Sequence, residues 1–461
     1  MRVVSSAILA AIIFHLAPAA GAEPFPRPAS LESQVRFWRN TFGVYSRSQA
    51  VVHDTADLDK IYSVVDVSAN AEGMSPGELD DYMRYASEVE VTRVRGILRR
   101  LHQAGSNPKD LSAEEQGIFD LFKGDRNPDK FLDAVERVRS QRGLREKFAY
   151  GIQVAHGYFP EMERIFREEG LPTELTRLPL VESCFNVEAY SKVGAAGIWQ
   201  FMPATGRIYS MNVGALVDER RDPIASTRAA ARFLRHNYEQ LDEAWPLAIT
   251  AYNHGPGGIR RAIEETGTTD IGVIVERYHG PAFGFASRNF YAEFVAALDV
   301  EKHHEAYFGK LEPERREPSR VVSLDRPVGI EVAARLAHTE RETLVALNPA
   351  LMDPVIDGRR NIPGGYDLRV PVSGASGFEE RVAEFGAEQR VVRVSAPAPP
   401  SRRSSSSKSG MATAHRVGKG DTLSEIAARY KVSVASLKTA NGLKGSQSIR
   451  RGQVLKIPGR T

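Results

Sequence analysis

Apolar positions three or four residues apart recur along much of the chain and predict helices. A short run covers residues 131–138, and a longer one, Ser226 to Leu241, predicts an amphipathic helix. Its expected inner face consists of Ala230, Phe233, Leu234, Asn237, Tyr238 and Leu241. Pro246 predicts the start of the next helix, which the glycines of residues 255–258 end. The pattern therefore predicts a mainly α-helical protein.

One carboxylate falls on such an apolar stripe. Glu182 follows Leu171, Leu175 and Leu178 at intervals that place all four side chains on one face of a helix. Burial disfavours the charged form of a carboxyl group and raises its pKa, which suits a general acid that must keep its proton near neutral pH. Spacing alone leaves another interpretation open, in which Glu182 caps or salt-bridges the end of a helix kinked by Pro179.

Three short motifs with Glu182 in the first of them follow in order. They are Glu182-Ser183 within VESCF, the turn GAAGIWQFMPATG over 194–206, and AYNHGPGG over 251–258, with DERRDP at 218–223 between the last two. Together they resemble the lytic transglycosylases of glycoside hydrolase family 23, and among these the membrane-bound lytic murein transglycosylase D type. The resemblance implies a lysozyme-like helical catalytic domain, the SLT domain.

The resemblance also implies roles for single residues. Glu182 is the expected catalytic acid, and the expected substrate-binding residues are Ser183, Gln200, Tyr252, Asn253, Trp199 and Tyr291. For Trp199 we expect core packing in preference to the cleft, and for Gln200 the cleft. Phe290 stands where relatives carry a tyrosine, so Tyr291 is the candidate for the missing hydroxyl group.

The implied reaction cleaves the β-1,4 bond between N-acetylmuramic acid and N-acetylglucosamine and closes a 1,6-anhydro ring. It needs one carboxylate, because the 2-acetamido group of the substrate replaces the second carboxylate of ordinary glycosidases. We expect no metal and no cofactor. Two alternatives stay open: a lysozyme-like muramidase, for which no second acid is recognisable, and a non-catalytic peptidoglycan-binding protein.

Cys184 and the pair His53-Asp54 could each be interpreted as a chemical site. Cys184 is the only cysteine, so an intramolecular disulfide is excluded, and a cysteine nucleophile is a weaker alternative than simple packing. His53-Asp54 has no evident further metal ligands, and we read it as a surface or capping pair.

The C-terminal part changes pattern. Residues 321–371 look like a degenerate LysM-like unit, and 372–414 form a linker that is Pro/Ser-rich in its second half. Residues 415–459 resemble a LysM peptidoglycan-binding domain of βααβ architecture. The resemblance implies that the module binds glycan near Gly420, Asp421, Thr422, Leu423 and Asn441.

The N-terminal part begins with the order of a cleavable signal peptide over residues 1–22. Residue 23 is Glu, so a lipoprotein anchor is not supported. We expect a helical region over 23–149, the catalytic domain over 150–310, and export to the periplasm or cell envelope.

Charge is unevenly spread. The chain carries a net charge of +3, yet residues 401–461 contain thirteen Lys/Arg against two Asp/Glu. In an exported protein this basic end suits an anionic wall or membrane surface, and we expect no nucleic acid partner. We expect a monomer that binds peptidoglycan glycan strands. Endo or exo cleavage and preference for peptide-bearing or stripped glycan stay undetermined.

Overall fold

The computed structural model describes residues 23–105, 108–385, 413–418, 421–430, 432–443 and 453–458. The expected signal peptide and the Pro/Ser-rich part of the linker lie outside these ranges. The chain divides into two compact units, residues 1–387 and 388–461. Within the described ranges, no helix combines the length and hydropathy that crossing a membrane requires. The mainly α-helical fold with a small α+β module at the C-terminus is confirmed.

The N-terminal region is not purely helical, which corrects the expectation for residues 23–149. After α1 (Glu32–Gly43), an antiparallel sheet has the strand order β2-β1-β3. The strands are β1 (Gln49–Asp54), β2 (Ile61–Asp66) and β3 (Val138–Arg142). Five successive residues of β1 are buried, so this central strand lacks the alternation that marks a strand in sequence.

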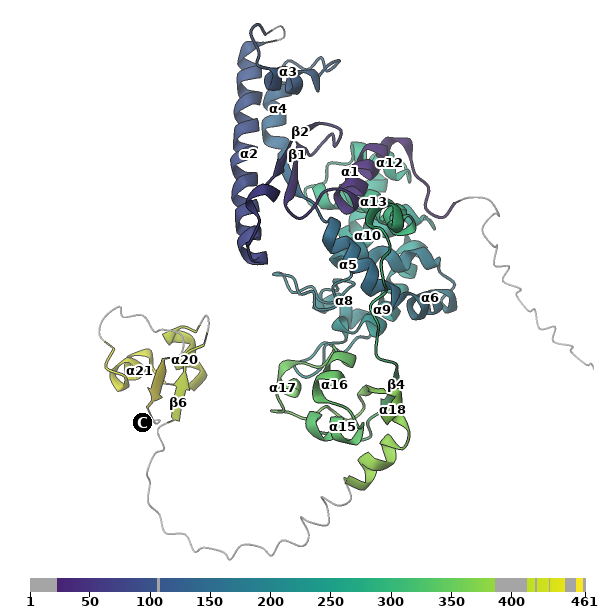
Figure 1. Cartoon of the computed structure of the whole chain (residues 1–461), viewed down its shortest axis with the longest axis vertical. Helices are drawn as coiled ribbons and strands as arrows, with labels where there is room; N and C mark the ends of the chain where they lie inside the picture. Colours follow the sequence, from purple (N-terminus) through teal and green to yellow (C-terminus); the bar gives the residue numbers. More distant parts are fainter. Residues whose placement is uncertain are drawn as a thin grey trace, which may run out of the picture. The chain divides into compact units, whose positions relative to one another are not determined.

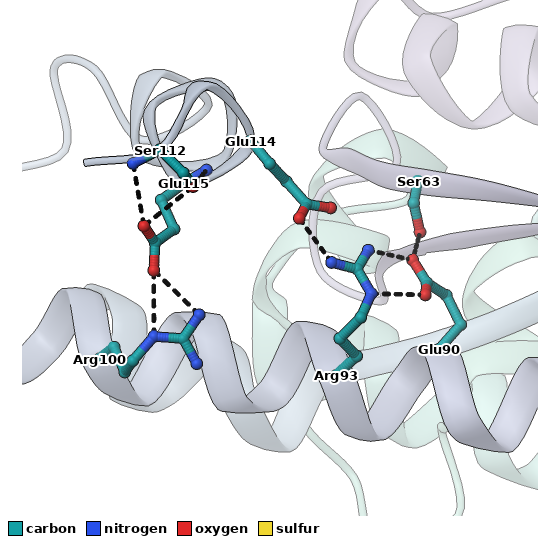
Figure 2. A network of polar contacts seen from close by, with 7 residues as sticks. All are labelled: Ser63, Glu90, Arg93, Arg100, Ser112, Glu114 and Glu115. Carbon is teal, nitrogen blue, oxygen red and sulfur yellow. Dashed lines mark hydrogen bonds and ion pairs between the residues drawn. The ribbon is translucent and has the colours of Figure 1, made fainter.

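Helices flank this sheet. The long helix α2 (Pro76–Ala104) lies beside α4 (Lys130–Arg137), with β1 and β2 next to them (Figure 1). Ion pairs join α2 to α3 (Ala113–Asp120): Arg93 contacts Glu114 at 2.6 Å, and Arg100 contacts Glu115 at 2.9 Å (Figure 2). Within α2, Glu90 also contacts Arg93 at 2.6 Å. Such exposed pairs contribute little singly, but together they fix how α3 lies on α2.

Nine helices of the described chain form the body that carries Glu182. They are α5 (Arg145–His156), α6 (Phe159–Glu168), α7 (Leu178–Ser183), α8 (Pro203–Ile208), α9 (Pro223–Gln240), α10 (Trp245–His254), α11 (Pro256–Thr266), α12 (Ile271–Arg277) and α13 (Phe285–Lys302). Helix α13 packs against α1, α10 and α7, and the short α14 (His304–Phe308) follows it.

The helix predicted from periodicity over Ser226 to Leu241 and the helix predicted to begin near Pro246 are both present, as α9 and α10. Helix α9 buries Ala230, Leu234 and Asn237 completely, and Phe233 and Tyr238 are half-buried beside them. Pro246 stands in the first turn of α10, where a missing N–H costs no intrahelical hydrogen bond.

His53-Asp54 is buried, which corrects the reading of a surface or capping pair. Asp54 receives two hydrogen bonds from Arg137 Nε at 3.0 Å and one from the Tyr62 hydroxyl at 3.1 Å. The His53 ring lies 4.6 Å from that of Phe37, and burial lowers the pKa of His53 to about 4. The pair is part of the core of the N-terminal region.

Two βααβ units follow. The first has β4 (Ser319–Ser323), α15 (Ile330–Leu336), α16 (Arg341–Leu347) and β5 (Asp367–Pro371), with the short helices α17 (Asp353–Ile356) and α18 (Val372–Ala375) added. The second has β6 (Thr413–Arg416), α20 (Leu423–Tyr430), α21 (Val434–Ala440) and β7 (Val454–Ile457).

In both units, an asparagine side chain makes two hydrogen bonds to the backbone of the second strand. Asn348 Nδ2 donates to Arg369 O at 2.8 Å, and Asn348 Oδ1 accepts from Arg369 N at 2.9 Å. Asn441 makes the same pair of bonds with Lys456, at 2.7 and 2.6 Å. The shared contact shows that residues 321–371 have the architecture of the C-terminal module despite their divergent start.

Candidate active site

Glu182 stands at the end of a short helix, and not on the long helix that the spacing predicted. A 3₁₀ turn covers Thr173–Arg177, and only α7, Leu178–Ser183, is α-helical. Pro179 opens α7 and does not kink it, because its missing N–H is one of the donors that a helix start leaves unpaired. The expected burial still holds, since Leu175 and Leu178 are fully buried beneath the turn.

The carboxyl group of Glu182 is half-buried and poorly solvated. Among the described residues it has no hydrogen-bond or ion-pair partner, so the capping or salt-bridge interpretation does not describe it. Burial raises its pKa to about 8. The group is therefore mostly protonated at neutral pH, as a general acid requires.

The chain after Glu182 is held in a constrained turn. Cys184 and Phe185 have φ of 49° and 54°, in the left-handed region that non-glycine residues rarely adopt. Ser183 Oγ donates to Ile198 O at 2.9 Å and so ties this turn to the glycine-rich segment. Burial raises the pKa of the Cys184 thiol to about 11, which leaves it protonated and unsuited to act as a nucleophile.

The glycine-rich turn is fastened by the DERRDP segment. Arg220 is almost fully buried, pairs with Asp218 at 2.6 Å, and donates to Gly194 O at 2.7 Å and Phe201 O at 2.9 Å. Gly197 has φ of 73°, and a Cβ there would lie 1.9 Å from Arg220 O. Only glycine fits this close backbone contact.

Gln200 and Trp199 have different surroundings. Gln200 is half-buried with φ of 50°, and its Nε2 donates to Gly197 O at 2.8 Å. The indole of Trp199 is fully buried, donates to Thr227 Oγ1 at 2.9 Å and stacks on Phe166. Trp199 thus has a core position, and its side chain offers no face to a sugar.

The third motif meets the first two. The Tyr252 hydroxyl donates to Trp199 O at 2.8 Å, and the nearby charge of Glu182 adds to burial in raising the pKa of Tyr252. Asn253 is exposed, and its Oδ1 accepts from Ser287 Oγ at 2.9 Å. Glu182, Ser183 and Tyr252, which come from two of the ordered motifs, therefore lie near one another.

Tyr291 is not part of this site, contrary to the expectation. Its side chain is 2% exposed, and its hydroxyl donates to Pro26 O at 2.6 Å, in the segment that leads into α1. The hydroxyl group near Glu182 belongs to Tyr252.

The carboxyl group that sequence reasoning missed is Glu293, also on α13. It is half-buried, and its pKa is raised to about 8, first by burial and then by the negative charge of Glu182, while Arg139 opposes the shift. The available signal was one carboxylate within the apolar run FYAEFVAA, residues 290–297. No motif marks it.

The loop beside the glycine-rich turn carries exposed apolar side chains. Tyr190 is 63% exposed and Val193 is 76% exposed, and Tyr190 also forms a bridge with Ala196 in the turn. An exposed aromatic ring suits contact with the apolar face of a pyranose.

In the C-terminal module, the residues expected to bind glycan mostly hold the fold. Asp421 accepts from His415 Nε2 at 2.8 Å, Thr422 caps α20 through Glu425, and Asn441 binds β7. Leu423 packs against the small core, and Gly420 lies outside the described residues. No group of three or more His, Cys, Asp or Glu side chains suited to a metal ion occurs in the described ranges.

Parts of the chain are similar to known protein domains. Residues 162–275 match the transglycosylase SLT domain, and residues 415–458 match the LysM domain. The membrane-bound lytic murein transglycosylase D of Escherichia coli K12 is 30% identical over 334 residues, covering 70% of this chain and 68% of that protein. The soluble lytic murein transglycosylase of Salmonella typhimurium is 28% identical over 129 residues, 27% of this chain and 19% of that protein.

Among solved structures, the 70 kDa soluble lytic transglycosylase of Escherichia coli matches 34% of this chain and 25% of its own, with 23% identity and a TM-score of 0.27. The SLT match covers α7 and α10, the helices that carry Glu182 and Tyr252.

Proposed function

The chain belongs to the lytic murein transglycosylase family of the membrane-bound D type, and from this membership we propose that it cleaves peptidoglycan glycan strands and forms 1,6-anhydro-N-acetylmuramic acid. The observation that carries the proposal is the Glu182 carboxyl group, half-buried, unpaired among the described residues and with its pKa raised to about 8.

Glu182 protonates the oxygen between N-acetylmuramic acid and N-acetylglucosamine as the bond to C1 breaks. The 2-acetamido oxygen of the substrate stabilises the positive charge at C1. The ionised Glu182 then removes the proton of the C6 hydroxyl group, whose oxygen attacks C1 and closes the anhydro ring. No water is consumed, so the reaction is a lyase reaction, and each proton transfer contributes roughly 10²–10⁴ in rate.

Neighbouring groups support these steps. Gln200, Asn253 and the exposed ring of Tyr190 are candidates to hold the sugar rings, while Ser183 and Tyr252 position the backbone around the acid. Because burial raises the pKa of Glu293 to about 8, the group is mostly neutral near pH 7 and can donate a hydrogen bond in the site.

Glu293 also favours a second candidate function, that of a muramidase. Ordinary glycosidases use two carboxyl groups, and a second one lies close enough to Glu182 to sense its charge. Its raised pKa weighs against this alternative, because a group that activates water as a base must be ionised.

We propose the following organisation for the exported protein: a signal peptide over 1–22, a helical and sheet-containing N-terminal region over 23–149, the transglycosylase domain over 150–310, a LysM-like unit that begins at 321, a linker and a LysM module over 415–459. The linker expected over 372–414 starts later than predicted, because α18 (Val372–Ala375), Phe378 and Val382 belong to the LysM-like unit, and the last two are buried in its core. Membership of this family supports a location in the cell envelope, and we propose a periplasmic monomer held to the wall by the LysM module.

Mass spectrometry of soluble products tests the reaction. The protein is incubated with purified peptidoglycan, and the released muropeptides are analysed. We expect ends of 1,6-anhydro-N-acetylmuramic acid. Reducing ends would establish the muramidase instead, and binding without release would leave a non-catalytic wall-binding protein.

A further inference from the structure

A hollow of about 820 Å³ opens within the first compact unit, apart from Glu182. One wall consists of α5 and residues 185–188, which follow the catalytic turn. The other consists of residues 314–317 and α16 of the first βααβ unit. Its volume is that of a ligand site.

Hydrogen bonds fix the two walls relative to each other. Glu314 N, in the second wall, donates to Gln153 O of α5, in the first, at 3.0 Å. Further bonds anchor the DERRDP segment to the βααβ unit. Asp218 N donates to Ala350 O at 2.8 Å, and Met352 N donates to Leu216 O at 3.0 Å. Val217 is buried in the core of the βααβ unit. The hollow is therefore a fixed part of the first compact unit. The DERRDP segment, which also fastens the glycine-rich turn, contributes Arg221, Asp222 and Pro223 to its lining.

The lining carries charges of both signs together with aromatic side chains. Arg316 is occupied, since it lies 3.7 Å over the Tyr158 ring and donates to Gly157 O at 3.1 Å. Among the described residues, the side chains of Arg315, Glu188 and Glu317 have no hydrogen-bond or ion-pair partner. The hollow thus offers free positive and negative groups.

These groups indicate the chemistry of the occupant. A neutral sugar is held by amides, hydroxyl groups and aromatic faces and needs no charged partner of either sign. A short peptide with carboxylates and an amine pairs with both an arginine and glutamates. In peptidoglycan, the peptide attached to N-acetylmuramic acid carries these charges.

We propose that this hollow binds the peptide of peptide-bearing glycan strands while the sugar lies at Glu182; the inference rests on the proposed function. The hollow begins close to Glu182 along the chain. Phe185 lines the hollow three residues after Glu182, so their Cα atoms lie within about 11 Å, and an extended peptide of four residues spans about 13 Å.

Two variants and a matched control test the proposal. Arg315→Glu reverses the free positive charge, and Ala346→Trp fills the hollow from an exposed position on α16. Arg320→Ala removes an exposed arginine that does not line the hollow.

The probe is the soluble tetrapeptide that an amidase releases from peptidoglycan, and calorimetry measures its binding to the full chain and each variant. We expect at least a tenfold weaker affinity for Arg315→Glu and for Ala346→Trp, and wild-type affinity for Arg320→Ala. Absence of binding to the wild type, or equal binding to all four proteins, would overturn the proposal. Because calorimetry does not depend on turnover, this failure is distinguishable from failure of the reaction itself.

Discussion

At the scale of single residues, the Glu182 carboxyl group costs the fold stability at neutral pH. Its folded pKa of about 8 lies above the value of 4.5 for a solvated glutamate. The stability that its tightly held proton contributes is fully present below about pH 4.5 and is lost as the pH rises through about 8. Burial thus keeps the acid protonated near neutral pH and lowers the stability of the fold there.

Replacement of Glu182 by Gln should stabilise the protein in a pH-dependent way. Glutamine cannot ionise, so Glu182→Gln should gain about 1–3 kcal/mol over the wild type at pH 8 and little at pH 4.5. Urea unfolding at both pH values measures the difference. The control is Glu188→Gln at an exposed position; a gain of equal size at both pH values would contradict the linkage.

Replacement of Glu293 by Gln should change the pH profile. Like charges oppose each other's ionisation, so Glu182 should lose its proton more easily when Glu293 cannot ionise. We expect the alkaline limb of the kcat/KM profile to move about one pH unit lower. Loss of activity at every pH would instead make Glu293 a direct participant, as in a two-carboxylate hydrolase.

Some residues near Glu182 could be predicted from the sequence and others could not. Glu182, Ser183 and Tyr252 were predictable because each lies in a motif. Glu293 has no motif, and its role depends on how α13 packs against α7. Tyr291 was wrongly assigned to the site. It precedes Glu293 by two residues, and two residues along a helix turn a side chain by roughly 200°, so Tyr291 faces away from the side on which Glu293 lies near Glu182.

At the scale of elements, the site depends on the turn between α7 and α8 more than on either helix. The close contact of Gly197 with Arg220 O holds this turn. Periodicity predicted α9 because a long amphipathic helix has a clear pattern, and Pro246 with the glycines after His254 predicted the two ends of α10. The periodic pattern has limits. It missed β1, whose successive buried residues do not alternate, and it joined the 3₁₀ turn to α7, because leucine spacing does not distinguish the two helix types.

Replacement of Gly197 by Ala should unfold the turn. The added Cβ meets Arg220 O, and φ of 73° is strained for alanine. We expect a loss of at least about 2 kcal/mol relative to Gly194→Ala in urea unfolding. Gly194 is a matched control, because it also has a positive φ but no atom within 4 Å of its added Cβ. Equal losses would mean that the close contact carries no stability.

At the scale of the whole molecule, the chain joins a catalytic unit to a separate module by a linker. The resemblance of the catalytic unit and of the C-terminal module to known domains could be recognised in the sequence. The hollow between α5 and α16 was not, because it is formed by segments about 200 residues apart.

Removal of residues 388–461 should separate binding from turnover. Linked binding raises the effective concentration of an enzyme at its substrate, and the deletion removes the LysM match at 415–458. In a pull-down, the shortened protein should bind insoluble peptidoglycan at least tenfold less than the full chain, with turnover of soluble glycan retained. Unchanged binding would show that the first compact unit alone retains the protein on the wall.

The most direct test of the account is the turnover of peptidoglycan by Glu182→Gln beside the wild type. The glutamine keeps the size and polarity of the side chain and removes only its proton chemistry. We predict a fall of at least about 10³ in the rate of release of anhydro-muropeptides, with the fold retained. A variant that still releases them at a rate near that of the wild type would contradict the assignment of Glu182 as the catalytic acid.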